Sequence, residues 1–341
     1  MTSSIPHAKR RLRILAALAA TAALTATAAA CSSSASKTAL VGSTGKPTLV
    51  IGQQSSGIVS LVRDSHALDG APYTVKWAVF PFGPPLVAAA AAGQIDLGDV
   101  GDVPPLNGAA KTPGFKVVAA ELPAKEGQAG DYLIVPKGSP IKTLADLRGK
   151  KVGYPAGSSA HGFLLNAVRS VGLGPDSVTF VNLAPAALQS AFASGQLDAA
   201  SLWNPQVTLD VQKGARILAA GTRPLDPNVG FYVASDKSLK DPQRRALVAD
   251  LLARLGRAYQ YGDEHLDVWA KDVQAETGID ADTAKIVVEN GTVTVRHVSD
   301  DTIQAEQKLA DTFIAAKQIT QPVDVHGIID NLLPASFDGK N

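Results

Sequence analysis

The chain has 341 residues, of which 45% are hydrophobic and 18% are charged, with 32 Lys and Arg against 31 Asp and Glu. This length predicts two domains with sizeable cores, and the balanced charge excludes a basic nucleic-acid-binding surface as the default interpretation. The single cysteine, Cys31, excludes intrachain disulfides and multi-cysteine metal sites. The six histidines lack metal-ligand spacing, so we expect no metal site and no cofactor.

Residues 1–30 are predicted to be a signal peptide, because four basic side chains precede an apolar segment too short for a retained span. Ala28-Ala29-Ala30-Cys31 resembles a lipoprotein cleavage site, with Cys31 as the acylated first residue. Residues 31–46, which begin with a Ser-rich tract, are then a flexible linker to the lipid anchor. Simple secretion is the alternative, and Arg10-Arg11 leaves open whether export follows the general or the twin-arginine route.

Two stretches about a hundred residues apart have the same pattern. Each consists of a short strand, a Ser-Ser loop, a helix, a second strand and a Pro-initiated, Ala-rich helix that ends at glycine. The matching parts are the strands at 49–52 and 151–154, the loops Ser55-Ser56 and Ser158-Ser159, the strands at 77–80 and 180–183, and the helix ends Gly93 and Gly195. This order of matches predicts two related α/β lobes.

Repeated strand–helix–strand units predict parallel sheets, whose ligands lie beyond the carboxyl ends of the strands. Both Ser-Ser loops follow such ends, so we expect them to line one cleft between the lobes. Residues 131–135 and 229–234 read as crossings between the lobes. Helices predicted from Pro242 to about Tyr261 and from Ser299 through Ala316 complete the first lobe. The predicted boundaries are therefore 47–132 with 236–341 for the first lobe, and 133–235 for the second.

Four segments resemble a known family in their sequence and order. They are Phe82-Gly83-Pro84-Pro85-Leu86, Gly101-Asp102-Val103-Pro104-Pro105, the stretch 144–152, and Gly157-Ser158-Ser159-Ala160-His161. The chain resembles the substrate-binding proteins of ABC importers for sulfonates, nitrate and taurine, most closely the aliphatic sulfonate branch. The resemblance implies a type II periplasmic-binding-protein fold and a monomer without catalysis. It also implies delivery of a small anion to an ABC permease and its ATPase, at the outer face of the cytoplasmic membrane.

The same resemblance supplies candidate ligand-binding residues. They are Gln54, Ser55, Phe82, Gly83, Gly101, Asp102, Ser158, Ser159, His161 and Trp203. Three positions depart from the family pattern: Phe82 replaces a small residue, Ala88 a Glu, and Asn204 an Asp. These departures concern the identity of the ligand, and an alkyl sulfonate, taurine, nitrate or a thiamine-precursor pyrimidine all stay open.

A sulfonate needs several hydrogen-bond donors and no catalytic base. Helix starts near Ser56, Pro84, Pro104 and Ala160, the serine hydroxyls and the Gln54 amide are the expected donors. Phe82 and Trp203 are the expected apolar wall, whereas Trp77, Phe80 and Phe231 are expected in the core.

Each candidate also has a structural alternative. The serines can be helix caps, His161 can lie on the surface, and Asp102 can cap a helix or face a ligand ammonium. An enzyme on the same fold is the alternative function class. It would need a nucleophile or an acid–base pair, and the sequence shows neither.

Overall fold

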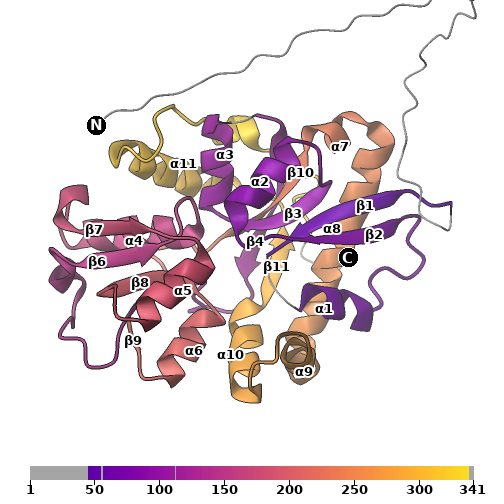
Figure 1. Ribbon diagram of the computed structural model, residues 1–341. Coiled ribbons are helices and arrows are strands. Elements are labelled where there is room, and N and C mark those ends of the chain that lie inside the picture. The colour runs from indigo at the N-terminus through magenta and orange to yellow at the C-terminus, as the bar shows by residue number, and fades with distance from the viewer. Residues whose placement is uncertain (1–44, 55–56, 112, 338–341) are drawn as a thin grey trace, which may run out of the picture. The chain divides into compact units, whose positions relative to one another are not determined.

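The computed structural model describes residues 45–54, 57–111 and 113–337 (Figure 1). The signal peptide, Cys31 and Ser55 therefore lie outside the described residues. The chain divides into two units, residues 1–39 and 40–341, and the description below concerns the second. No helix among the described residues is both long enough and apolar enough to cross a membrane.

The first lobe is built on a six-stranded mixed sheet in the order β11-β4-β10-β3-β1-β2. Strands β1, β2 and β3 are parallel, whereas β10 runs antiparallel between β3 and β4. The strands are β1 (Thr48–Gln53), β2 (Thr74–Val79), β3 (Leu97–Gly101), β4 (Phe115–Pro123), β10 (Gly230–Ser235) and β11 (Val293–Arg296).

The second lobe repeats this arrangement with five strands in the order β7-β6-β8-β5-β9. They are β5 (Asp131–Val135), β6 (Lys151–Tyr154), β7 (Thr179–Asn182), β8 (Ala199–Trp203) and β9 (Arg216–Ala220). The parallel set β7-β6-β8 matches β2-β1-β3, and in each sheet an antiparallel strand follows, β5 or β10. The internal duplication predicted from the sequence is thus present in the strand order.

The duplication extends to single contacts. Gly52 on β1 and Gly153 on β6 occupy equivalent positions below a helix. A Cβ atom at Gly52 would lie 2.8 Å from Ile95 Cδ1, and a Cβ atom at Gly153 would lie 2.5 Å from Leu197 Cδ1. Glycine at these two positions lets the helix approach the sheet closely. The helices of this layer end as predicted, at glycines with positive φ, 66° at Gly93 and 73° at Gly195.

Helices cover both sheets (Figure 1). They are α1 (Ile58–Asp64), α2 (Gly83–Ala91), α3 (Val103–Lys111), α4 (Ser159–Ser170), α5 (Pro185–Ala193), α6 (Gln206–Gln212), α7 (Asp236–Lys240), α8 (Pro242–Glu264), α9 (Leu266–Thr277), α10 (Ala281–Gly291) and α11 (Asp300–Ala315). The starts of the two predicted tail helices are confirmed. Asp241 accepts from the amides of Gln243 and Arg244 to cap α8, and Ser299 accepts from Thr302 N to cap α11.

The two predicted lobe boundaries need correction. Strand β5 belongs entirely to the second sheet, and β10, predicted within the second lobe, is a central strand of the first sheet. The crossings are therefore the segments before these strands, residues 124–130 and 221–229. Both strands are almost wholly buried apolar runs. A buried run of this kind gives no local signal for which sheet it joins.

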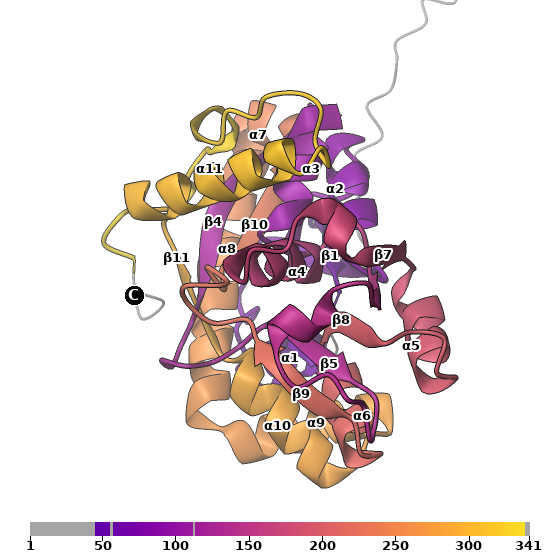
Figure 2. The ribbon, with the colours of Figure 1, turned by 90° about the vertical axis from the view of Figure 1, so that its left-hand side faces the viewer.

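The lobes touch on both sides of a central cavity. On one side α4 packs against α3 and α11 in an apolar cluster that includes Val103, Leu165 and Phe313, and Figure 2 shows α11 beside α4. On the other side Gln212 on α6 donates to Thr283 Oγ1 on α10 at 2.8 Å.

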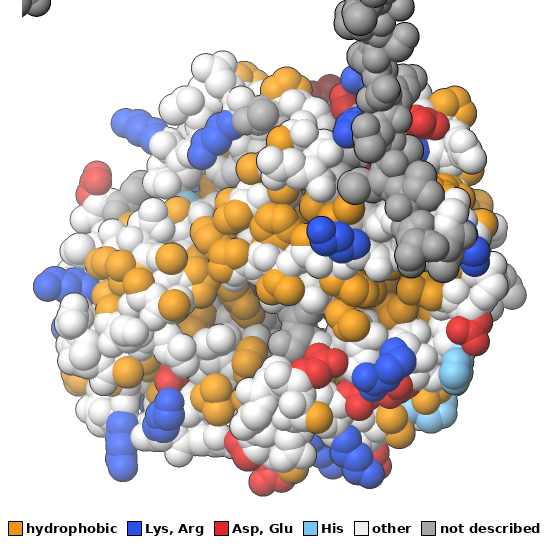
Figure 3. Space-filling view, turned by 45° about the vertical axis from the view of Figure 1, so that its right-hand side comes forward, with side chains coloured by type: hydrophobic (Ala, Val, Ile, Leu, Met, Phe, Trp, Pro, Cys, Tyr) orange, Lys and Arg blue, Asp and Glu red, His pale blue; other side chains and the backbone are white. Residues whose placement is uncertain are grey.

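Figure 3 shows one face of the molecule, on which hydrophobic side chains occupy the middle and charges of both signs lie mostly around the margin.

Candidate functional site

A cavity of about 700 Å³ lies between the lobes, at the carboxyl ends of β1, β3 and β8. We call it the interlobe cavity. Both lobes contribute to it, as expected for an α/β protein that binds its ligand where strand-to-helix loops meet. Seven of the predicted residues line it: Gln54, Gly83, Gly101, Asp102, Ser158, Ser159 and Trp203. Their contact with a ligand stays a prediction.

On the side of the first lobe, Gln54 uses its amide donor within the protein. Its Nε2 donates to the carbonyl of Asp99 at 2.7 Å, so one of the two amide hydrogens is used within the protein. Gly83 begins α2 against the ring of Pro104, and a Cβ atom at Gly83 would overlap that ring. These contacts bring the starts of α2 and α3 together at the edge of the cavity.

On the side of the second lobe, Ser158 precedes α4 without capping it. Its Oγ donates instead to the carbonyl of Pro155 at 2.7 Å. Ser159 reaches across to the first lobe, where a Cβ atom at Gly101 would lie 2.9 Å from Ser159 Cβ. Glycine at position 101 therefore allows the lobes to come this close. The start of α4 faces the cavity without a side-chain cap from Ser158.

The structure places His161 away from the cavity, contrary to its predicted position there. The ring is 2% exposed between Tyr154 and Phe313, with centroid distances of 4.5 and 4.8 Å. Its Nδ1 accepts from the amide of Gly157 at 3.2 Å, and burial lowers the pKa of His161 to about 4. His161 is thus a neutral core residue that holds the 157–158 turn. The motif fixes its place on α4 but not the direction in which the side chain points.

Phe82 also lies outside the interlobe cavity, half-buried at the N-cap of α2. Trp203, at the end of β8, lines the cavity as an aromatic wall. Of the aromatics predicted in the core, Phe231 is confirmed there at 2% exposure, whereas Trp77 and Phe80 are partly buried and pack against the clusters of the first lobe.

The sequence interpretation missed most of the acidic side chains of the cavity. Asp99, Asp102, Glu121, Asp131 and Asp226 all line it, and Lys, Arg and His are absent from its described lining residues. Only Asp102 was among the candidates. A usable signal was present, because Asp99 and Glu121 interrupt buried apolar strands, where a charged residue is rare without a partner.

Burial dominates the electrostatics of these carboxyls. Loss of solvation raises the pKa of Glu121 to about 8 and that of Asp99 and Asp226 to about 6. For Asp102 and Asp131, burial and then the charge of Asp226 raise the pKa well above its usual range. Asp102 accepts from the amide of Val103 at 2.8 Å, at the start of α3.

Across the described part of the chain, no group of three or more His, Cys, Asp or Glu side chains is arranged to hold a metal ion.

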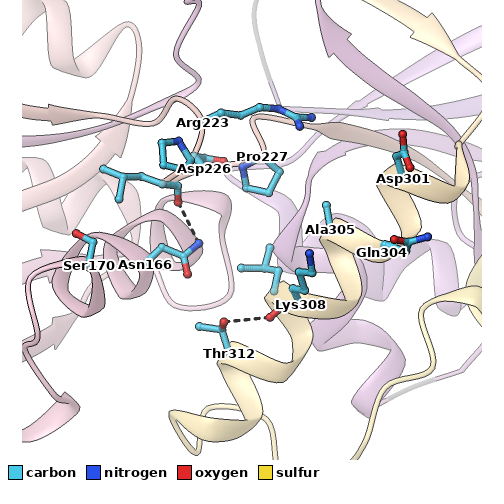
Figure 4. A pocket seen from close by; sticks show the side chains of 13 residues that line it. Asn166, Ser170, Arg223, Asp226, Pro227, Asp301, Gln304, Ala305, Lys308 and Thr312 are labelled. Carbon is cyan, nitrogen blue, oxygen red and sulfur yellow. Dashed lines mark hydrogen bonds between the residues drawn. The ribbon is translucent and has the colours of Figure 1, made fainter.

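A second cavity, of about 680 Å³, lies at the surface between α4, the 223–227 loop and α11 (Figure 4). Asn166 donates to the carbonyl of Leu225 at 3.0 Å, and Arg223 and Lys308 lie around the opening. Asp226 lines both cavities, so the returning crossing separates them. The interlobe cavity is the candidate site, because strand ends and helix starts converge on it and not on the second cavity.

Comparisons with known proteins agree with this geometry. A family model described as NMT1/THI5 like matches residues 88–268. A relative from Escherichia coli (strain K12), named as an aliphatic sulfonates-binding protein, is 30% identical over 312 residues, which cover 90% of this chain and 95% of the relative.

Two solved structures share the fold over most of their length. The alkanesulfonate-binding protein SsuA from Xanthomonas axonopodis pv. citri, bound to MOPS, is 28% identical with a TM-score of 0.77, covering 84% of this chain and 99% of that one. The periplasmic aliphatic sulphonate binding protein SsuA from Escherichia coli is 28% identical with a TM-score of 0.74, covering 86% and 94%. The predicted periplasmic-binding-protein fold is confirmed. The chain therefore belongs to the NMT1/THI5-like family and, within it, to the sulfonate-binding proteins of ABC importers.

Proposed function

We propose that this protein is the extracytoplasmic substrate-binding component of an ABC importer and captures a small organic sulfonate in the interlobe cavity. The observation that carries the proposal is the cavity itself, which both lobes line at the ends of their parallel strands in a chain with sulfonate-binding relatives. In this role the protein binds and releases its ligand without changing it, acts as a monomer, and delivers the ligand to a permease and its ATPase.

The start of α4 is the best place for the sulfonate group. Proline occupies the first turn or the N-cap of the other helices that begin at the cavity, at Pro84, Pro104, Pro185 and Pro205, and each proline removes one backbone donor. Helix α4 begins with Ser159 and Ala160, which both carry an N–H group, and Ser158 does not cap it. The amides and the positive end of the helix dipole favour an anion there.

Trp203 is the proposed contact for the carbon chain of the ligand, because its ring lines the same cavity. Micromolar binding corresponds to about −8 kcal/mol. A few charge-assisted hydrogen bonds at roughly 1.5–3 kcal/mol each, together with burial of a short alkyl chain, supply a free energy of this size after the cost of ordering the ligand.

Isothermal titration calorimetry of the full chain with linear alkanesulfonates of two to eight carbons tests the proposal. We expect saturable binding with a dissociation constant in the micromolar range or below, and a rise in melting temperature with ligand concentration. Sodium nitrate and a neutral pyrimidine serve as controls. Binding of either control, without binding of any sulfonate, would assign the cavity to another ligand.

We propose further that the protein is held at the outer face of the cytoplasmic membrane by acylation of Cys31. Cys31 follows three alanines and precedes the Ser-rich tract, which fits a tethered domain. In cells that express the full chain, a fatty-acid analogue should label the wild type, and Cys31→Ala should remove the label. An unlabelled wild-type protein that appears in the medium would contradict the anchor.

A further inference from the structure

A buried cluster of four carboxyl groups lies where the two lobes meet. Asp131 begins β5 of the second lobe, Asp102 precedes α3, Glu306 lies on α11, and Asp226 lies in the returning crossing. We call these four residues the junction cluster. Each is at most 3% exposed, and within the described chain none of them forms an ion pair. Neither water nor a protein cation therefore compensates a negative charge in the cluster.

The backbone holds Asp131 and Asp226 close together. The amide of Gly221 donates to the carbonyl of Asp131 at 2.7 Å, and a Cβ atom at Gly221 would lie 2.5 Å from Asp226 Oδ2. Asp226 Oδ1 accepts from the amide of Asn228 at 2.8 Å, which fixes this carboxyl group in place. A residue of the second lobe and a residue of the crossing thus share one buried acidic site.

Glu306 has no hydrogen-bond partner in the described structure. Both of its carboxyl oxygens are buried and unpartnered, and Asp131 Oδ1 is in the same condition. Such buried acceptors are uncommon in native proteins. Burial raises the pKa of Glu306 well above its usual range, and the charges of Asp102 and Asp226 raise it further. The neutral acid is therefore the favoured form of Glu306 in this arrangement of the lobes.

The second cavity brings the junction cluster close to solvent. Asp226 lines both cavities, and Ala305, the neighbour of Glu306 on α11, lines the second one (Figure 4). Glu306 itself lines neither cavity. A proton can thus reach Asp226 from the second cavity while a ligand fills the interlobe cavity.

We propose that capture of an anion in the interlobe cavity is coupled to proton uptake by the junction cluster. Asp102, Asp131 and Asp226 line this cavity, so a bound sulfonate brings a further negative charge close to them. That charge disfavours the carboxylate form and raises the affinity of the cluster for protons.

The position of the junction cluster between the lobes acts in the same direction. Opening of the cavity would move Asp131 away from Glu306 and admit water to both, which favours their ionised forms. Closure around a ligand removes this water, so it should bind protons. The protein should therefore hold its ligand more tightly in mildly acidic than in alkaline surroundings. This inference rests on the proposed function and adds a means of regulating its site.

The other acidic groups of the interlobe cavity have the same sign of coupling. Asp99 and Glu121 also line it, with pKa values raised by burial to about 6 and about 8. An anion raises both pKa values further, so these groups also take up protons and release none.

The remaining titratable groups nearby do not reverse the coupling. Burial lowers the pKa of His161 on α4 to about 4, so its ring stays neutral between pH 6 and 8. The tyrosines beside the acidic groups have pKa values raised above 10 and also stay neutral; they are Tyr132, Tyr232 and Tyr259. The charged residues at the opening of the second cavity are exposed, and solvent screens them; they are Arg223, Asp301 and Lys308.

Calorimetric titration of the full chain with butane-1-sulfonate measures the coupling, because this ligand has no group that titrates between pH 6 and 8. Titrations at pH 7 in bis-Tris and in Tris, amine buffers of different ionisation enthalpy, give the number of protons exchanged without a competing buffer sulfonate. We expect net proton uptake on binding. The dissociation constant should be about tenfold larger at pH 8 than at pH 6.

The possible results separate the inference from the proposed function. Proton release, or binding with no proton exchange and no dependence on pH, would overturn the inference and leave the proposed function standing. If butane-1-sulfonate binds at neither pH, the proposed function fails, and the inference with it.

Glu306→Gln tests the junction cluster without touching the ligand, since Glu306 lines neither cavity and glutamine keeps its shape. The variant should take up fewer protons per bound ligand and lose part of the pH dependence, while it still binds butane-1-sulfonate at pH 6. Asp226→Asn, which removes a second charge of the cluster, should also reduce the uptake.

Asp210→Asn is the matched control, because Asp210 on α6 is also buried with an unpartnered carboxyl oxygen but does not line the interlobe cavity. It should keep the proton uptake of the wild type. Thermal unfolding at pH 6 establishes that each variant is folded. If Glu306→Gln and Asp226→Asn both take up protons as the wild type does, the protons bind elsewhere and the inference is overturned.

Discussion

The two lobes repeat one pattern, yet they stabilise an equivalent aspartate differently. Asp96 and Asp198 each accept a hydrogen bond from a strand amide, from Val50 N at 2.7 Å and from Lys151 N at 2.8 Å. Asp96 is 4% exposed and also pairs with Arg244 of α8. Asp198 is half-buried, and among the described residues it has no ion-pair partner. The same local sequence thus forms the same hydrogen bond in both lobes. Only Asp96 also forms a buried ion pair, because Arg244 of the distant helix α8 contacts it.

A second contrast lies between Asp96 and the carboxyl groups of the interlobe cavity. Asp96 also accepts from Ser238 Oγ at 2.5 Å, so its oxygens are fully used by the protein. Glu121 and Asp131 are also buried, 9% and 3% exposed, but each has one oxygen without a partner in the described structure. A paired buried carboxylate maintains the fold, whereas a buried carboxyl oxygen without a partner lowers its stability.

The largest expected effect separates the two aspartates. Asp96→Ala should lower the free energy of unfolding by about 3–5 kcal/mol, because it leaves Arg244 partly buried without its partner. Asp198→Ala should lower it by about 1 kcal/mol, the contribution of one partly exposed hydrogen bond. Urea denaturation of both variants measures the difference. Equal losses of stability in the two variants would show that the ion pair with Arg244 of α8 does not stabilise the first lobe.

The equivalent glycines under the helices should behave alike. Gly52→Ala and Gly153→Ala should each lower the free energy of unfolding by about 1–3 kcal/mol, because the added methyl overlaps leucine and isoleucine side chains of the layer above. Gly174→Ala is the control, since a Cβ atom there meets nothing within 4 Å and φ is −84°. A tolerated substitution at either test site would mean that the helix can move away from the sheet in that lobe.

The unpaired carboxyl groups should make stability depend on pH. The pKa of Glu121 is raised in the folded protein from 4.5 to about 8, so the folded state binds the proton more tightly than the unfolded state does. The free energy of unfolding should therefore fall as pH rises from about 5 to 8, by at most about 1.4 kcal/mol per pH unit for this one proton. Burial lowers the pKa of His161 to about 4, which acts in the opposite direction below pH 6.5.

Glu121→Gln isolates this contribution. Compared with the wild type, the variant should lose less stability between pH 5 and 8, as measured by urea denaturation across that range. The His161 contribution is common to both proteins and cancels in the difference. Parallel curves for the two proteins would show that Glu121 titrates normally in the folded state.

The smallest expected effect is a change in ligand affinity, measured for one substitution on each side of the interlobe cavity. Ser158→Ala should weaken binding of a sulfonate ligand by less than about 0.5 kcal/mol, because the single hydroxyl hydrogen of Ser158 is already donated to the carbonyl of Pro155. Gln54→Ala should weaken binding by up to about 1 kcal/mol, because Gln54 Nε2 carries two hydrogens and only one of them is donated to the carbonyl of Asp99. Calorimetric titration of both variants with the same ligand tests this order. The reverse order would show that the Ser158 hydroxyl turns from Pro155 to the ligand.

The sequence alone determined the fold class, the duplication and the limits of several elements. Strand β6 spans 151–154 as predicted, and Asp241 and Ser299 cap the two tail helices. These features depend on residues that are close in sequence, because alternation, helical period, capping and turn glycines are local properties. The family motifs likewise indicated which loops meet at the cavity, although contact of their residues with a ligand stays a prediction.

Only the tertiary structure decided which sheet each crossing strand joins, where His161 points, and which acidic groups meet in the cavity. Apart from Asp131 and Ser235 at their ends, strands β5 and β10 are apolar on both faces, so their sequences fit either sheet equally well. Asp99, Glu121, Asp131 and Asp226 come from four separate segments. Their convergence depends on the packing of distant strands and crossings, and the pKa of each carboxyl group depends on burial by neighbours that no local pattern specifies.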